Sequence, residues 1–303
     1  MRRRALTALL ALLGAAAHAG AVESDVVHQV GRVVFRVDTR YAYPGGVLLA
    51  RVSSSTRLGG VSVLLAGRRV PLMPAGGVLR ALVPVPLTLA PGPLTLGFEV
   101  SARRGRQRIP VEIQTVPRAY PPRVVSLPPA KLALVASRQT LFDGRRVLQA
   151  LRETALQVVH LGPLRPPVDG VAGQGFGCPT SYPGADRPVE NLEDALFGEQ
   201  HHGLDYEVPV GTAVRAPGAG RVLLATWLAG TGWTVLIDHG EGMVSGLLHL
   251  SAVAVRAGDE VQAGAVVGRS GEHGLVPGPL VQWNTYVHGV AVDPEILTRG
   301  FPE

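Results

Sequence analysis

Cysteine is nearly absent from this chain of 303 residues, in which Cys178 is the only one. An intramolecular disulfide is therefore excluded, and hydrophobic cores must stabilise the folded state. A lone cysteine is usually a small buried hydrophobe, and no signature of a catalytic cysteine surrounds Cys178. We therefore do not expect a cysteine-dependent enzyme.

Charged and aromatic residues are also scarce, at 17% and 5% of the chain. The charged share is below the roughly 25% that soluble domains usually carry. Half of the net charge of +6 comes from Arg2, Arg3 and Arg4. A weakly charged chain with few aromatics does not favour nucleic-acid binding. The 38 glycines and 25 prolines indicate short strands and tight turns, so we expect a mostly β protein.

Long apolar runs are missing after the first residues. Residues 1–19 are predicted to be a signal peptide, with a basic start, an apolar core over Ala5 to Ala17 and a small-residue cleavage site at Ala17-His18-Ala19. No later segment offers about 20 continuous apolar residues, so we expect no transmembrane anchor after cleavage. The predicted location is secreted or periplasmic, in the cell envelope.

Residues 20–118 are predicted to form an immunoglobulin-like β-sandwich, because short β-type segments recur there about every ten residues. These segments are Val33 to Val37, Val47 to Val52, Val61 to Ala66, Leu79 to Val85, Leu94 to Val100 and Arg108 to Val116. The basic run Arg103 to Arg108 indicates a solvated hairpin tip. Attraction to an anionic wall or membrane surface is the alternative interpretation of that run.

Residues 119–165 are predicted to be a Pro-rich and helical connector, with the helix over Arg138 to Gln157. The second domain, residues 166–303, shows almost no helical periodicity. Its strands are predicted at Ala213 to Ala216, Gly220 to Ala225, Thr234 to Asp238, Met243 to Leu250, Ala265 to Gly268 and Val281 to Val287. An antiparallel sheet folded into a sandwich or open barrel follows from this pattern.

His201 and Asp205 are the candidate metal ligands, since histidine and carboxylate both bind zinc. Their spacing alone is weak evidence. The context strengthens it, because His-x-Gly-x-Asp is followed in order by Ile237-Asp238-His239-Gly240, Leu248-His249-Leu250-Ser251 and the segment Val255 to Gly264.

This ordered series resembles the lysostaphin-type, or LytM-like, zinc endopeptidases that cut peptide cross-bridges in bacterial peptidoglycan. The resemblance implies a duplicated-hybrid-motif β fold, and the N-terminal region and helical connector look like those of many exported members. It also implies that His201 and Asp205 are the first two zinc ligands and that His249 is the catalytic histidine.

The closing motif of the family, Gly-Pro-His-Leu-His, reads here as Gly278-Pro279-Leu280-Val281-Gln282. Leu280 therefore replaces the general base, and Gln282 replaces the third zinc ligand. Leucine cannot accept a proton, and a neutral amide oxygen is a poor substitute for imidazole at zinc. His202 and His273 are the two histidines that a rearranged site could recruit.

The replacements favour a catalytically degenerate domain, in which zinc is weakly bound or absent. Such a protein would bind or remodel peptidoglycan, or regulate a cell-wall hydrolase. The alternative is an active zinc-dependent peptidoglycan endopeptidase with a rearranged ligand set. A third hypothesis gives the function to the immunoglobulin-like half, as an adhesion or carbohydrate-binding module.

Overall fold

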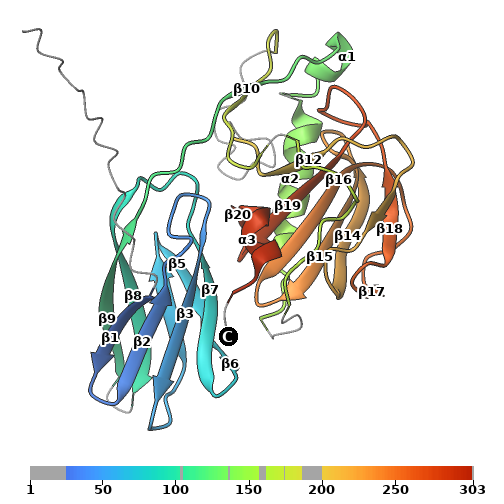
Figure 1. Ribbon diagram of the computed structural model, residues 1–303. Coiled ribbons are helices and arrows are strands. Elements are labelled where there is room, and N and C mark those ends of the chain that lie inside the picture. The colour runs from blue at the N-terminus through green and yellow to red at the C-terminus, as the bar shows by residue number, and fades with distance from the viewer. Residues whose placement is uncertain are drawn as a thin grey trace, which may run out of the picture.

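The computed structural model describes residues 25–102, 105–135, 137–156, 162–173, 175–185 and 200–301, which include almost all of the predicted β region. The predicted signal peptide lies outside the described residues. As expected, the fold is mostly β, with a two-sheet sandwich, a connector and a second β domain arranged in chain order (Figure 1).

The sandwich consists of two antiparallel sheets that enclose an apolar core. Its strands are β1 (Asp25–Val30), β2 (Val33–Asp38), β3 (Val47–Ser54), β4 (Val61–Leu65), β5 (Arg68–Pro71), β6 (Met73–Ala75), β7 (Val78–Pro84), β8 (Gly92–Ala102) and β9 (Gly105–Thr115). One sheet has the order β1-β2-β3-β7-β6 and the other β5-β4-β8-β9. Inward residues alternate with outward ones, as in Val61, Val63 and Leu65 of β4. The pairing pattern is one that immunoglobulin-type sandwiches use, so we retain that assignment as a proposal.

The connector contains β10 (Arg123–Val124), α1 (Pro129–Leu132) and α2 (Arg138–Leu151), and β10 pairs in parallel with β11 (Thr180–Ser181). Helix α2 begins after Ser137, whose hydroxyl accepts a hydrogen bond from the Thr140 N–H at 3.1 Å. Val147, Ala150 and Leu151 share one helical face and are buried. Among the described residues, none of the helices has the length and apolarity needed to cross a bilayer.

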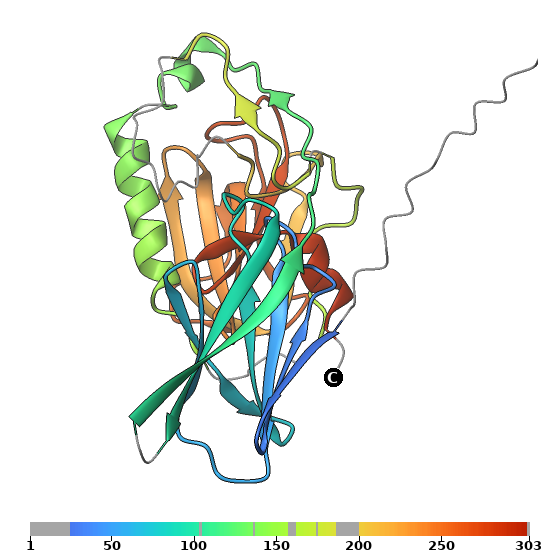
Figure 2. The same cartoon turned by 90° about the vertical axis from the view of Figure 1, so that its left-hand side faces the viewer.

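Helix α2 covers the outer face of the second domain, where its apolar residues pack on Leu228, Leu236, Leu248 and Tyr286 (Figure 2). The Asp143 carboxylate adds a polar attachment, because it accepts a hydrogen bond from the Ala229 N–H at 2.6 Å. The helix is thus fixed against the sheet that carries the candidate site.

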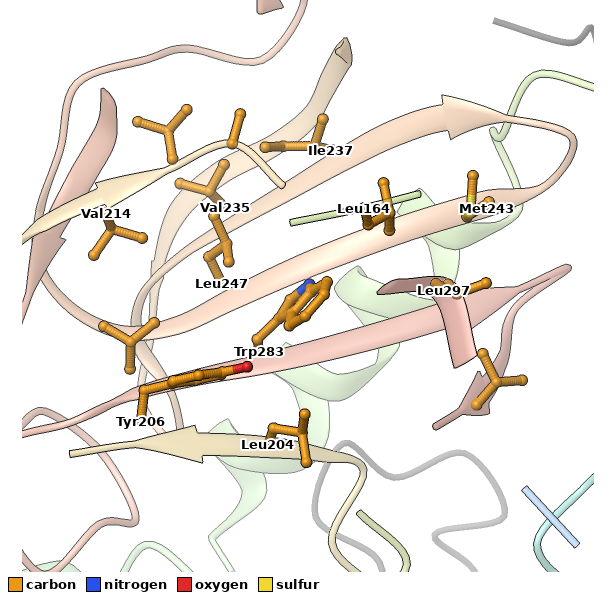
Figure 3. Close-up of a cluster of buried hydrophobic side chains, with 14 of the residues drawn as sticks. Leu164, Leu204, Tyr206, Val214, Val235, Ile237, Met243, Leu247, Trp283 and Leu297 are labelled. Atoms are coloured by element: carbon orange, nitrogen blue, oxygen red, sulfur yellow. The ribbon is translucent and has the colours of Figure 1, made fainter. Parts of the chain in front are cut away.

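The second domain is a nine-stranded antiparallel sheet. Its strands are β12 (Gly203–Tyr206), β13 (Ala213–Arg215), β14 (Gly220–Leu228), β15 (Gly232–Gly240), β16 (Met243–Val253), β17 (Glu260–Val261), β18 (Val266–Ser270), β19 (Val281–Val287) and β20 (Val290–Val292), followed by α3 (Pro294–Arg299). The main order is β12-β19-β16-β15-β14-β17, and β18 pairs with both β13 and β16. Leu204, Val235, Leu247 and Trp283 form part of the core on the face away from α2 (Figure 3).

The sandwich and the second domain share a continuous apolar interface. Val47, Leu49 and Leu82 belong to the same buried cluster as the core of the second domain. Arg80 and Glu241 form a two-pronged ion pair across it, with nitrogen to oxygen distances of 2.7 and 2.6 Å. The two parts are therefore held in a fixed arrangement by both packing and charge.

Candidate functional site

The candidate site lies on three neighbouring strands, β12, β19 and β16. Asp205 on β12 pairs with Gln282 on β19, and Gln282 pairs on its other side with Leu248 on β16. Gly203 lets β12 approach β19 closely, because a Cβ at this position would lie 2.1 Å from the Asn284 Oδ1. In the His-x-Gly-x-Asp motif, the glycine thus permits close strand packing and the aspartate supplies a side chain to the site.

The predicted ligand pair, His201 and Asp205, is brought together. His201 Nε2 lies 3.1 Å from Asp205 Oδ1, and both atoms are buried without a hydrogen bond. His201 Nδ1 lies 3.1 Å from the Gly175 carbonyl, to which it can donate its proton. With Nδ1 held by this carbonyl, Nε2 faces the Asp205 carboxylate, which is the ring orientation that a metal-binding histidine needs.

The guanidinium of Arg123 occupies the other side of Asp205. Its Nη1 donates to Asp205 Oδ2 at 2.8 Å, and its Nε donates to Thr180 Oγ1 at 2.8 Å. Burial alone would raise the pKa of Asp205, but the adjacent His201 and Arg123 outweigh burial and hold the pKa below its ordinary value. The carboxylate is therefore ionised at neutral pH, with a protein cation as its partner.

His249 is held by contacts on both ring nitrogens and on its backbone. Nδ1 lies 2.7 Å from the His273 carbonyl, and Nε2 lies 3.1 Å from the Gln282 side-chain amide. Its backbone has a φ of +65°, a left-handed conformation that is uncommon outside glycine, and its N–H donates to the Thr231 carbonyl at 2.7 Å. Burial lowers the pKa of His249, so we take the imidazole as neutral at pH 7.

A chain of hydrogen bonds runs from His249 along β19 to the Tyr286 hydroxyl. The side-chain amides of Gln282 and Asn284 are 2.8 Å apart, and the Asn284 amide is 2.9 Å from the Tyr286 hydroxyl. A neutral His249 that donates from Nδ1 must accept at Nε2. This requires the Gln282 amide to turn its NH₂ toward the ring, and an equivalent rotation of Asn284 then satisfies the whole chain, with Tyr286 donating. In this arrangement Gln282 serves as a bridge between buried polar groups.

The remaining predicted residues lie around this pair. Leu280 is buried, and its backbone pairs with Gly271. His273 is exposed, and its ring meets Trp227 edge to face with 4.9 Å between the ring centres, whereas its carbonyl contacts His249. His202 lines the same small cavity as His201, and burial together with its neighbour His201 lowers its pKa to about 4.

We tested whether these residues suit a zinc ion. Tetrahedral ligands at about 2.0 to 2.1 Å from zinc lie about 3.3 Å apart, which is close to the 3.1 Å between His201 Nε2 and Asp205 Oδ1. A catalytic zinc needs three protein ligands, however, and no cluster of three histidine, cysteine or carboxylate side chains occurs in the part of the chain that the structure describes. Arg123 also places a positive charge on the shared carboxylate. The donor set therefore does not fit a catalytic zinc centre.

Little space is available beside the ligand pair. The cavity there has a volume of about 20 Å³ and is lined by ten residues, namely Arg123, Thr180, Tyr182, Gln200, His201, His202, Thr231, His249, Leu275 and Gln282. This volume holds about one water molecule. The cavity itself is therefore too small to enclose a peptide.

Sequence reasoning missed two parts of this site. Arg123 lies in a Pro-rich connector more than 80 residues before Asp205, and no local pattern marks its role. Asn284 and Tyr286 could have been found, because polar or amphipathic residues at 282, 284 and 286 alternate along a predicted strand and must share one face.

The sequence model of Peptidase family M23 matches residues 199–294. The chain is 36% identical over 93 residues to the peptidoglycan DD-endopeptidase ShyA of Vibrio cholerae, which covers 31% of this chain and 22% of that protein. It is 32% identical over 164 residues to the murein hydrolase activator EnvC of Escherichia coli, and this match covers 50% of this chain and 38% of that protein. The chain thus spans well under half the length of these curated relatives.

The fold is also similar to a crystal structure from Pseudomonas aeruginosa assigned to peptidase M23. The TM-score is 0.60 at 27% identity, and the match covers 87% of this chain and 97% of that one. This coverage extends beyond residues 199–294, so the similarity in architecture includes more than the second domain.

Proposed function

We propose that this protein is exported to the cell envelope and acts on peptidoglycan without cleaving it, because residues 199–294, called the M23 domain below, match the sequence model of Peptidase family M23. The M23 domain would bind wall material and regulate a cell-wall hydrolase. The similarity to both a peptidoglycan endopeptidase and a murein hydrolase activator supports this direction.

One observation carries the proposal, namely the state of Gln282. The side chain stands beside Asp205, where a third ligand is needed, and it is instead engaged by His249 and Asn284. Its neutral amide cannot replace an imidazole as a zinc ligand of comparable strength. Arg123 further supports the proposal, since its guanidinium already balances the charge of Asp205.

The proposal is tested with the purified chain and isolated, insoluble peptidoglycan. We expect the protein to sediment with the peptidoglycan and to release no soluble muropeptides, whether zinc is added or removed. A wall amidase is then assayed with and without the chain, and a regulator is expected to change the amidase rate. Zinc-dependent release of muropeptides that a chelator abolishes would overturn the proposal.

A second candidate, an active zinc endopeptidase with a rearranged ligand set, is favoured by a separate observation. His201 Nε2 and Asp205 Oδ1 converge without a hydrogen bond, as two metal ligands do. This candidate predicts that His201→Ala abolishes hydrolysis while leaving sedimentation with peptidoglycan intact. Equal and negligible release by both proteins would eliminate it.

A further inference from the structure

An open apolar groove lies in the sandwich, remote from the M23 site. Its volume is about 560 Å³, within the usual range for pockets that take small ligands. Its apolar lining includes Val52, Val61 and Leu72, which are buried, and Leu58 and Met73, which are half-buried. The groove lies where the end of β3, the loop to β4 and the strands β6 and β7 meet.

Three arginines surround this groove, one in its lining and two placed beside it by strand pairing. Arg57 lines it directly. Arg32 precedes Val33, which pairs with the lining residue Ser54. Arg106 pairs with Ser101, whose N–H donates to the carbonyl of the lining residue Gly60 at 3.0 Å.

Arg32, Arg57 and Arg106 are exposed, and none forms an ion pair with another described residue. Glu99, two positions before Ser101, is already paired with Arg69. The turns at this end of the sandwich point away from the second domain in both views (Figures 1 and 2). The arginine charges are thus available to a partner from outside.

The charge of the sandwich supports an anionic partner. Residues 25–118 contain 13 arginines and four carboxylates, whereas residues 200–301 contain five arginines and nine carboxylates. Three of the four sandwich carboxylates, Asp25, Asp38 and Glu99, are paired with arginines of the same domain. The excess positive charge therefore belongs to the sandwich alone, and a net charge of this kind attracts anions.

From the apolar groove and its arginines we propose that the sandwich binds an anionic phospholipid. One acyl chain would occupy the groove lined by Leu58 and Met73, and the headgroup phosphate would contact Arg57, with Arg32 and Arg106 adding attraction to neighbouring anionic headgroups. A membrane surface carries both components, because acyl chains supply apolar area and anionic headgroups attract basic side chains. This site is independent of the chemistry at Asp205.

The first experiment measures binding of the full chain to vesicles by sedimentation. We expect binding to vesicles that contain phosphatidylglycerol and little binding to pure phosphatidylcholine. Each arginine near an anionic surface contributes a factor of about 5 to partitioning, so Arg57→Gln is expected to reduce binding about 5-fold. Arg256→Gln removes an exposed arginine of the M23 domain and should leave binding unchanged.

The second experiment separates insertion into the groove from adsorption by charge. Dihexanoyl phosphatidylglycerol below its micelle concentration is titrated by calorimetry against wild type, Leu58→Gln and Met73→Gln, with melting temperatures confirming that the variants fold. Saturable binding that each groove variant weakens several-fold is the expected result. Glycerol phosphate, which has the headgroup without the chains, should bind much more weakly.

Three outcomes would overturn the proposal. Equal binding of phosphatidylcholine would show unselective apolar contact, and equal binding of glycerol phosphate would show an anion site without a chain. An equal loss of vesicle binding in Arg57→Gln and Arg256→Gln would show a general effect of net charge. Peptidoglycan sedimentation measured on the same variants distinguishes this site from the proposed function of the M23 domain.

Discussion

At the residue scale, the candidate site brings His201 and Asp205 together, and the side chains of Arg123 and Gln282 lie beside them. His201 keeps the ring orientation of a ligand because Gly175 accepts its Nδ1 proton. Asp205 Oδ2 accepts a hydrogen bond from Arg123, and Gln282 belongs to a hydrogen-bonded chain. Each of these contacts satisfies a buried polar group that would otherwise be unpaired.

Restoring the third ligand and removing the competing cation should restore zinc binding. We expect Gln282→His combined with Arg123→Ala to retain about one zinc per chain after dialysis, measured by atomic absorption, because an imidazole would then stand beside His201 and Asp205. The matched control is Gln282→Leu combined with Arg123→Ala, which removes the cation without adding a ligand. Equimolar zinc in the wild-type chain would contradict this prediction.

Gly203 is a second position at which a single atom matters. Gly203→Ala places a Cβ 2.1 Å from Asn284 Oδ1 and 2.5 Å from the Trp283 carbonyl, so β12 must move away from β19. We expect a loss of about 1 to 3 kcal/mol in the free energy of unfolding, measured by urea denaturation. Gly278→Ala is the control, since nothing lies within 4 Å of its added Cβ. An equal effect of the two substitutions would contradict the steric explanation.

At the scale of elements, the attachment of α2 depends on a single carboxylate as well as on packing. Asp143 is buried, and its Oδ2 accepts the Ala229 N–H at 2.6 Å while Oδ1 accepts from Gln139 at 2.9 Å. The bond from Ala229 joins the helix to the turn after β14, whereas the bond from Gln139 lies within α2 and orients the Asp143 carboxylate.

Asp143→Ala should therefore destabilise the chain by about 1 to 3 kcal/mol, because the half-buried Ala229 N–H loses its acceptor. Hydrogen exchange of the Ala229 amide, measured by NMR, should accelerate together with that of the α2 amides. Arg145→Ala removes an exposed side chain of the same helix and serves as the control. Unchanged protection at Ala229 in Asp143→Ala would refute the attachment.

At the scale of the whole molecule, the junction between the sandwich and the M23 domain contains a titratable histidine, His288. His288 lies in the turn between β19 and β20, and burial lowers its pKa to about 4, although a hydrogen bond to the Leu82 backbone opposes the shift. Gly242 packs against the ring, since a Cβ there would lie 2.3 Å from His288 Nδ1.

The sign of the pH dependence follows from this shift. An unfolded histidine has a pKa of about 6.5, so protons bind the unfolded chain preferentially between pH 6.5 and 4. The contribution of the neutral His288 ring to the free energy of unfolding is fully present above pH 6.5. It is lost as the pH falls toward 4, and the loss amounts to up to about 3 kcal/mol. Urea denaturation at pH 7 and pH 4.5 should show a smaller acid-induced loss in His288→Asn than in wild type. A His28→Asn control, whose site is exposed, should follow the wild-type curve.

The amino-acid sequence by itself determined the β class and most strand positions, and the incomplete ligand set stays a prediction from the sequence. Alternating apolar residues and glycine turns are local signals, so they predicted β2, β3, β7 and β19 to within a few residues. Short strands such as β5, β6, β17 and β20 were missed, because two to four residues carry too little periodicity. The predicted helix ran to residue 157, whereas α2 ends at Leu151.

The tertiary structure alone decided what surrounds the ligand pair. Arg123 reaches Asp205 from 82 positions away along the chain, and Gln282 meets His249 from 33 positions away. His273 contributes a carbonyl to His249 and turns its ring to Trp227. Such contacts depend on how strands from distant segments are paired and packed, and no local residue pattern encodes them. The sequence thus determined which side chains stand at positions 201, 205, 249 and 282, and only the fold decided which distant groups contact them.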